Sequence, residues 1–229
     1  MAERAVVVTD MDGTLTTADT WRGVLAWVKA HYPSRAADTF VRSRLHLVAI
    51  AKLGLGSKEA FRAAWFHDLS LLLTGMTEEQ AADMCEYVVD AWLWPARREA
   101  GLTAVLAAFE RARAADPTAE LVLATGAFQG VADAFARRAG AQLAFGTPLE
   151  VQDGRLTGKI AGKVGSGAQK AAAIRVHAAD RTIVAAFGDT AADIPMLQMA
   201  QRAVAIAPDR QLRRAAVAAG WEILEGEPA

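Results

Sequence analysis

The feature that most constrains the fold is a short apolar run, AVVVT at residues 5–9, which is followed at once by DMDG at residues 10–13. Its length and its β-branched valines predict a strand, and its lack of polar alternation predicts that both faces of this strand are buried. Such strands are typical of parallel sheets that carry helices on both sides. The chain is therefore expected to be an α/β protein with two carboxylates where its first strand ends.

The segments after this strand show two different periodicities. The pattern is helical from residue 18 to residue 94, and Pro95 ends that block because proline disfavours helix in the residue before it. Beyond it strands and helices alternate. The expected segments are strands at 120–125, 182–189 and 203–207, helices at 97–115, 130–140 and 171–179, and an Asp-Gly hairpin at 149–160.

This alternation predicts a Rossmann-like three-layer core with a parallel sheet, built from residues 1–17 and 95–229. The helical block, residues 18–94, is predicted to be an all-helical cap domain inserted after the first strand. Ser57 and Thr77 are predicted N-caps of two of its helices. Five of the six tryptophans fall within this block, and we therefore expect it to have an apolar core of its own.

Composition narrows the classes of function. The formal net charge is −1 and there is no long basic block, which gives no reason to expect a nucleic-acid partner. The single cysteine, Cys85, excludes an intramolecular disulfide framework, and its helical surroundings favour a buried structural thiol. The start of the chain lacks the apolar core of a signal peptide, and no stretch is apolar for long enough to span a bilayer. We therefore expect a cytoplasmic protein without an integral membrane segment.

Polar residues follow several of the expected strands, where parallel sheets place their sites. These residues offer carboxylates, a hydroxyl, a lysine at a helix start and a glycine: Asp10, Asp12, Thr125, Gly126, Lys170, Asp189 and Asp193. Mg²⁺ prefers oxygen ligands and is usually held by one or two carboxylates together with a substrate phosphate. The set therefore suits a divalent cation and a phosphate group bound side by side.

Each residue type has a role in phosphoryl chemistry. An ionised carboxylate can attack phosphorus, and a protonated neighbour can give a proton to the leaving alcohol and later take one from water. Thr125 and the amides around Gly126 can hold phosphate oxygens, while Lys170 can neutralise developing charge. Lys163 lies in the same glycine-rich stretch and is the alternative lysine. We prefer Lys170, because Lys170 stands at the start of a predicted helix.

DMDGT (10–14), the strand that ends in Thr125, Lys170 and GDTAAD (188–193) resemble, in this order, the four motifs of the haloacid dehalogenase superfamily. The helical insert resembles the cap of its phosphoserine-phosphatase-like branch. The resemblance implies that Asp10 is the nucleophile and Asp12 the general acid and base. It also implies that Mg²⁺ is held by Asp10, the backbone carbonyl of Asp12 and Asp189, with Asp193 supporting a metal-bound water or Lys170.

Asp12 separates two reaction types within that superfamily. The dehalogenases lack an aspartate at this position because a halide leaving group needs no proton. Its presence favours a Mg²⁺-dependent phosphatase that acts on a small organic phosphomonoester through an aspartyl-phosphate. Three alternatives stay open: a phosphotransferase, a phosphatase for a hydrophobic or lipid phosphomonoester, and a non-catalytic module that binds phosphate or Mg²⁺.

Other interpretations apply to single residues. Asp189 and Asp193 also suit the cap of the helix that begins near Ile194-Pro195. In phosphoserine phosphatases an acidic residue binds the substrate amine and a cap arginine its carboxylate; here Asp19 and Arg62 are the candidates, and Arg62 is a poor positional match. The apolar run at 40–56, with basic residues at its margins, is predicted to be an amphipathic cap helix or a contact with a membrane surface.

Overall fold

A computed structural model of the chain describes residues 4–32, 58–165 and 167–226, without the side chains of residues 58–63. The predicted cap at Ser57 and the apolar run at 40–56 lie outside these residues, as does the side chain of Arg62. In the part of the chain that is described, no helix is both long and apolar enough to cross a membrane.

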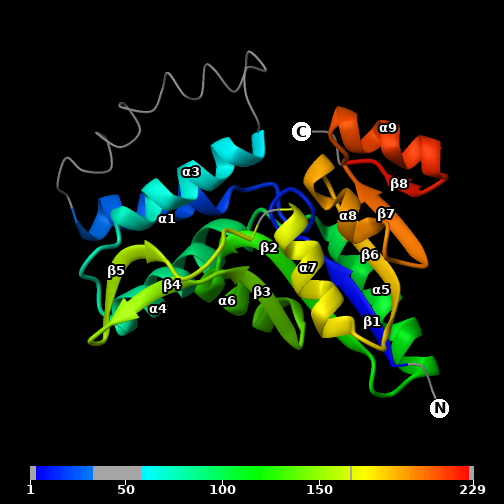
Figure 1. Cartoon of the computed structure of the whole chain (residues 1–229), viewed down its shortest axis with the longest axis horizontal. Coiled ribbons are helices and arrows are strands. Elements are labelled where there is room, and N and C mark those ends of the chain that lie inside the picture. Colours follow the sequence, from blue (N-terminus) through cyan, green and yellow to red (C-terminus); the bar gives the residue numbers. More distant parts are fainter. Residues whose placement is uncertain (1–3, 33–57, 166, 227–229) are drawn as a thin grey trace.

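Six parallel strands form the central sheet in the order β3-β2-β1-β6-β7-β8 (Figure 1). Their bounds are β1 Ala5–Thr9, β2 Glu120–Phe128, β3 Leu143–Thr147, β6 Thr182–Gly188, β7 Arg202–Ile206 and β8 Glu222–Leu224. The four predicted strands are present, and β3 and β8 are additional. The parallel Rossmann-like sheet is therefore confirmed.

Helices cover both faces of this sheet, because the apolar side chains of β1 point alternately to one face and to the other. Ala5 and Val7 pack into the apolar cluster on one face, and Val6 and Val8 into the cluster on the other. The first face carries α5 (Glu99–Ala115) and α6 (Gln129–Ala139); the second carries α7 (Gly167–Ala178), α8 (Ile194–Leu197) and α9 (Arg210–Ala219). The three layers match the predicted core.

The helices of the insert lie beyond the carboxyl ends of the central strands (Figure 1). They are α1 (Thr20–His31), α3 (Lys58–Leu71), α4 (Glu78–Tyr87) and a π-helical turn, η1 (Val88–Leu93), that continues α4. Thr77 caps α4 as predicted: its hydroxyl accepts from the amide of Gln80 at 3.2 Å, and its own amide donates to the Gln80 side chain at 2.9 Å.

The prediction of a separate apolar core for the insert is wrong. Val24, Leu69 and Met84 belong to the same buried cluster as Val105 and Phe135 under the sheet. Helices α4 and α6 approach so closely that a Cβ at Gly130 would lie 2.7 Å from the sulfur of Cys85. Burial there raises the pKa of the Cys85 thiol to about 12, in agreement with a structural role.

The predicted hairpin consists of β4 (Leu149–Gln152) and β5 (Arg155–Ile160), joined by Asp153 and Gly154, both with positive φ. It packs on the insert, because Gly75 donates to the carbonyl of Leu156 at 2.8 Å and Leu156 to that of Met76 at 2.8 Å. The boundaries between core and cap, at residues 17 and 95, stay a prediction. The hairpin belongs to the predicted core and contacts the predicted cap.

Candidate active site

The site forms where the order of the sheet reverses, between β1 and its neighbour β6. In the strand register, Thr9 lies opposite Leu123 of β2 and Phe187 of β6. The amide of Asp10 donates to the carbonyl of Phe187 at 3.0 Å, so β1 and β6 end side by side. This places Asp10 next to Asp189, at the position where sheets of this order bind ligands.

Lys170, on the first turn of α7, joins two of the carboxylates. Its Nζ donates to Oδ1 of Asp10 at 2.6 Å and to Oδ1 of Asp193 at 2.5 Å, and all three side chains are buried. Burial opposes the charged form of lysine, but Asp10 and Asp193 raise its pKa above the ordinary value. Lys163 is exposed. The position of Lys170 therefore supports it over Lys163 as the functional lysine.

Three carboxylates share one small volume: oxygens of Asp10, Asp189 and Asp193 all lie within 4.8 Å of one another. Thr14 bridges two of them, with its Oγ1 3.2 Å from Oδ2 of Asp10 and 3.2 Å from Oδ1 of Asp189. Burial, and then the charges of Asp10 and Asp193, raise the pKa of Asp189 to about 8. Burial also raises the pKa of Asp10, despite Lys170.

One lysine cannot neutralise this group. A divalent cation among the carboxylates would relieve the remaining repulsion, and hard oxygen donors are the ligands that Mg²⁺ prefers. The donor set therefore fits the predicted metal.

Asp193 uses its two oxygens differently. Oδ1 pairs with Lys170, whereas Oδ2 accepts from the amide and the hydroxyl of Thr190 at 3.0 and 3.1 Å and caps the short helix η2 (Ala191–Asp193). Burial alone would raise the pKa of Asp193, but the charge of Lys170 and these hydrogen bonds lower it. Asp193 therefore caps η2 and makes no side-chain cap to α8, the helix for which the cap was predicted, while its role in the site stays a prediction.

Asp12 is tied to the first turn of the insert. Its Oδ1 accepts from the hydroxyl of Thr20 at 2.8 Å, and its Oδ2 from the Thr20 amide at 3.3 Å. Burial, together with the weaker effect of Asp10, raises the pKa of Asp12 to about 7 against these hydrogen bonds. A group with that pKa can both give and take a proton near neutral pH. The contact with Thr20, the first residue of α1, was not predicted.

The region of Thr125 and Gly126 differs from the prediction in one respect. Strand β2 continues to Phe128 instead of ending at Thr125, although its register with β3 is irregular between Ala124 and Phe128. The carbonyl of Gly126 accepts from the Thr147 hydroxyl at 2.9 Å. The hydroxyl of Thr125 accepts from the amide of Ala127 at 3.2 Å.

Gly13 determines how closely the first loop approaches Asp189. Its φ is +88°, and a Cβ there would lie 2.0 Å from Oδ2 of Asp189. Arg98, a contact that was not predicted, donates from Nε to the carbonyl of Gly13 at 2.8 Å. The loop is thus held against a carboxylate with no space for a side chain.

Replacing Gly13 by alanine is expected to lower the free energy of unfolding and to displace Asp189. Gly75→Ala is a matched control, because φ of Gly75 is +80° and nothing lies within 4 Å of an added Cβ. The control measures backbone strain alone, about 1–2 kcal/mol, and we expect Gly13→Ala to cost about 2 kcal/mol more. Urea denaturation of both variants measures the difference; equal losses would show that the loop relaxes away from Asp189.

Comparison with known proteins agrees with this arrangement. The family model of haloacid dehalogenase-like hydrolases matches residues 7–198. The chain belongs to this family. Among its relatives, the phosphoserine phosphatase SerB1 of Mycobacterium tuberculosis is 40% identical over 97 residues, which cover 41% of this chain and 32% of SerB1. The matched part is therefore about a third of the length of that relative.

Solved structures share the fold of this haloacid dehalogenase-like hydrolase along almost its whole length. A protein of unknown function from Bordetella pertussis Tohama I superposes with a TM-score of 0.78 at 20% identity, covering 97% of this chain and 99% of its own. A substrate-bound phosphoserine phosphatase gives a TM-score of 0.64 at 17% identity, with coverage of 98% and 94%. At these identities the likeness concerns the fold.

Proposed function

We propose that this haloacid dehalogenase-like hydrolase is a Mg²⁺-dependent phosphomonoesterase that acts through an aspartyl-phosphate on Asp10. The observation that carries the proposal is the pair of Asp10, held by the buried ammonium of Lys170, and Asp12, a half-buried carboxyl with a pKa of about 7. The phosphatase activity named for SerB1 supports the same class of reaction. A module that only binds phosphate or Mg²⁺ has no need of a second carboxyl with this pKa.

The reaction would run in two steps at phosphorus. An oxygen of Asp10 forms a bond to phosphorus while the bond to the ester oxygen breaks, and Asp12 gives its proton to that oxygen, so that an alcohol leaves. Asp12 then takes a proton from water as the water oxygen attacks phosphorus. Inorganic phosphate leaves and Asp10 is restored. Lys170 favours the ionised form of Asp10 against the effect of burial and neutralises charge on the phosphoryl oxygens, which Thr125 and Gly126 are proposed to bind.

Asp10, Asp189 and the backbone carbonyl of Asp12 would hold Mg²⁺, which when bound supplies positive charge to the phosphoryl oxygens. Asp193 is proposed to act on this site indirectly, because its oxygens already accept from Lys170 and Thr190. The magnesium site thus uses residues from the ends of two adjacent strands.

Replacing Asp12 by asparagine tests the proton transfer. An activated ester such as 4-nitrophenyl phosphate has a leaving group that needs little protonation, whereas an alkyl phosphate needs the acid. We expect the first step to slow by about tenfold for the activated ester and by about a thousandfold for an alkyl ester, as single-turnover kinetics would measure. The second step still needs the base, so that phosphoenzyme should accumulate with the activated ester. Equal losses for both esters would remove Asp12 from the acid role.

The substrate is proposed to be a small organic phosphomonoester, without strict specificity for phosphoserine. Asp19, the candidate partner of a substrate amine, instead forms an ion pair with Arg22 at 2.9 Å on the exposed first turn of α1. A phosphotransferase is distinguished by product analysis with added acceptor alcohols, which would then appear as phosphate esters. We propose a cytoplasmic location and a small-molecule partner.

A further inference from the structure

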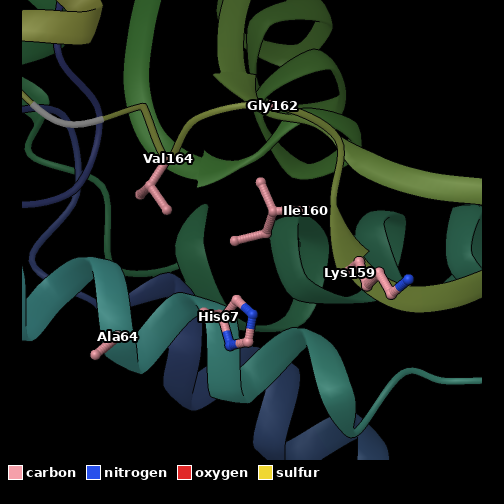
Figure 2. A pocket seen from close by; sticks show the side chains of 6 residues that line it. All are labelled: Ala64, His67, Lys159, Ile160, Gly162 and Val164. Carbon is pink, nitrogen blue, oxygen red and sulfur yellow. The ribbon is translucent and has the colours of Figure 1, made fainter.

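A cavity of about 450 Å³ lies between α3 of the insert and the segment that runs from β5 toward α7 (Figure 2). Its lining side chains come from these two segments only. They are Ala64, His67, Lys159, Ile160 and Val164, with the backbone of Gly162. In Figure 2 the side chains of His67, Ile160 and Val164 point toward the shared space, and Lys159 lies at its edge with its side chain turned outward.

The cavity adjoins the proposed phosphate site through Val164 and the next residue. A Cβ at Gly165 would lie 2.6 Å from the carbonyl oxygen of Thr125, so the two backbones are in contact. The amide of Gly165 also donates to Thr147 Oγ1 at 2.9 Å, and this hydroxyl donates to the carbonyl of Gly126. The same segment continues into α7, which carries Lys170. A phosphate at Thr125 would therefore lie beside the segment that lines this cavity.

The cavity is lined mainly by apolar side chains, and its polar side chains are the ammonium of Lys159 and the imidazole of His67. Ala64, Ile160 and Val164 provide aliphatic walls, and no carboxylate is among the lining side chains that the structure describes. Lys159 is exposed and makes no ion pair with any residue that the structure describes. His67 has Asp68 beside it, with Nδ1 3.7 Å from its carboxylate. An ammonium group, such as that of phosphoserine, would find no acidic partner among these described lining residues.

We propose that this cavity binds the leaving group, and that the preferred substrate is the phosphomonoester of an extended apolar alcohol with an anionic group at its far end. The inference rests on the proposed phosphatase function. A volume of about 450 Å³ is in the range of pockets that hold whole small molecules. Serine, the leaving group of phosphoserine, would leave most of this volume empty. Aliphatic walls favour methylene groups, and Lys159 favours a terminal anion.

The test compares phosphate release from a matched series of substrates. Ethyl, butyl and hexyl phosphate vary only the apolar length, 6-(phosphonooxy)hexanoate adds a terminal carboxylate, and O-phosphoserine supplies the ammonium. We expect kcat/KM to rise by up to about fourfold per added methylene, the value of a buried methylene. The terminal carboxylate should add about threefold to fivefold, as a partly exposed ion pair does. Phosphoserine should be the poorest substrate of its size.

Two charge reversals locate the anion site. Lys159→Glu should lower the ratio of kcat/KM for 6-(phosphonooxy)hexanoate to kcat/KM for hexyl phosphate by about tenfold. Lys163→Glu makes the same charge change four residues away, at an exposed position that does not line the cavity, and should change neither value. Ile160→Ala should flatten the dependence of kcat/KM on the length of the alkyl chain.

Three results would overturn the proposal: a preference for phosphoserine, a flat response to chain length, or equal effects of Lys159→Glu and Lys163→Glu. Failure of the proposed function is recognised separately, because the wild-type protein would then release no phosphate from 4-nitrophenyl phosphate with Mg²⁺. Binding to the Asp10→Asn variant, followed by tryptophan fluorescence, gives the same ranking without turnover. The experiment therefore decides on the leaving-group cavity even if turnover is slow.

Discussion

Replacing Asp10 by asparagine is expected to lower kcat for phosphate release by at least about 10⁴-fold while the protein stays folded. An amide cannot attack phosphorus as a carboxylate does, so no phosphoenzyme can form. The fold should tolerate the change, because Asn has the same shape and Lys170 keeps its ion pair with Asp193. Removal of one buried carboxylate also lessens the repulsion that raises the pKa of Asp189.

Phosphate release, acid-quenched phosphoenzyme and thermal melting by circular dichroism together check this result. Asp90→Asn is the control. Asp90 is an exposed carboxylate that pairs with Arg138, and neither residue belongs to the candidate site. It should keep wild-type kcat and a free energy of unfolding within about 0.5 kcal/mol. A folded Asp10→Asn protein with wild-type turnover would exclude Asp10 as the nucleophile.

The sequence located Asp10 and Asp189 because each follows a strand directly. Asp10 comes after AVVVT and Asp189 after TIVAAFG, and parallel strands end at the same edge. The contact of Thr20 with Asp12 could not be predicted in this way, since the two residues lie eight positions apart along the chain with a loop between them. A threonine at the start of a helix was the only local signal.

Elements with a long, regular hydrophobic pattern were predicted correctly. Short strands, and the packing of the insert on the core, were missed. Strand β8 has three residues, and β3 contains Gly146, so neither shows a clear period. Hydrophobic spacing also indicates that Met84 is buried without indicating its neighbours. The insert therefore looked independent in the sequence, although its apolar side chains pack on those of α5 and α6.

Replacing Lys170 by methionine is expected to destabilise the protein by about 3–5 kcal/mol in the presence of a chelator. The change leaves the buried Asp10 and Asp193 and the half-buried Asp189 within 4.8 Å of one another without a cation. Activity should also fall by about 10²–10³-fold, because a positive charge at the phosphoryl group is lost. Mg²⁺ should restore more stability to this variant than to the wild-type protein, since a more negative site binds a cation more tightly.

Urea denaturation in EDTA and in Mg²⁺ measures both effects, and Lys163→Met provides the control. Lys163 is exposed, so its loss should change the free energy of unfolding by no more than about 0.5 kcal/mol in either buffer. If Lys170→Met were as stable as Lys163→Met in EDTA, the three carboxylates would have to share protons instead of needing a cation. If Mg²⁺ stabilised neither protein, the carboxylates would not form a metal site. The two buffers therefore separate the charge that Lys170 supplies from the charge that the metal supplies.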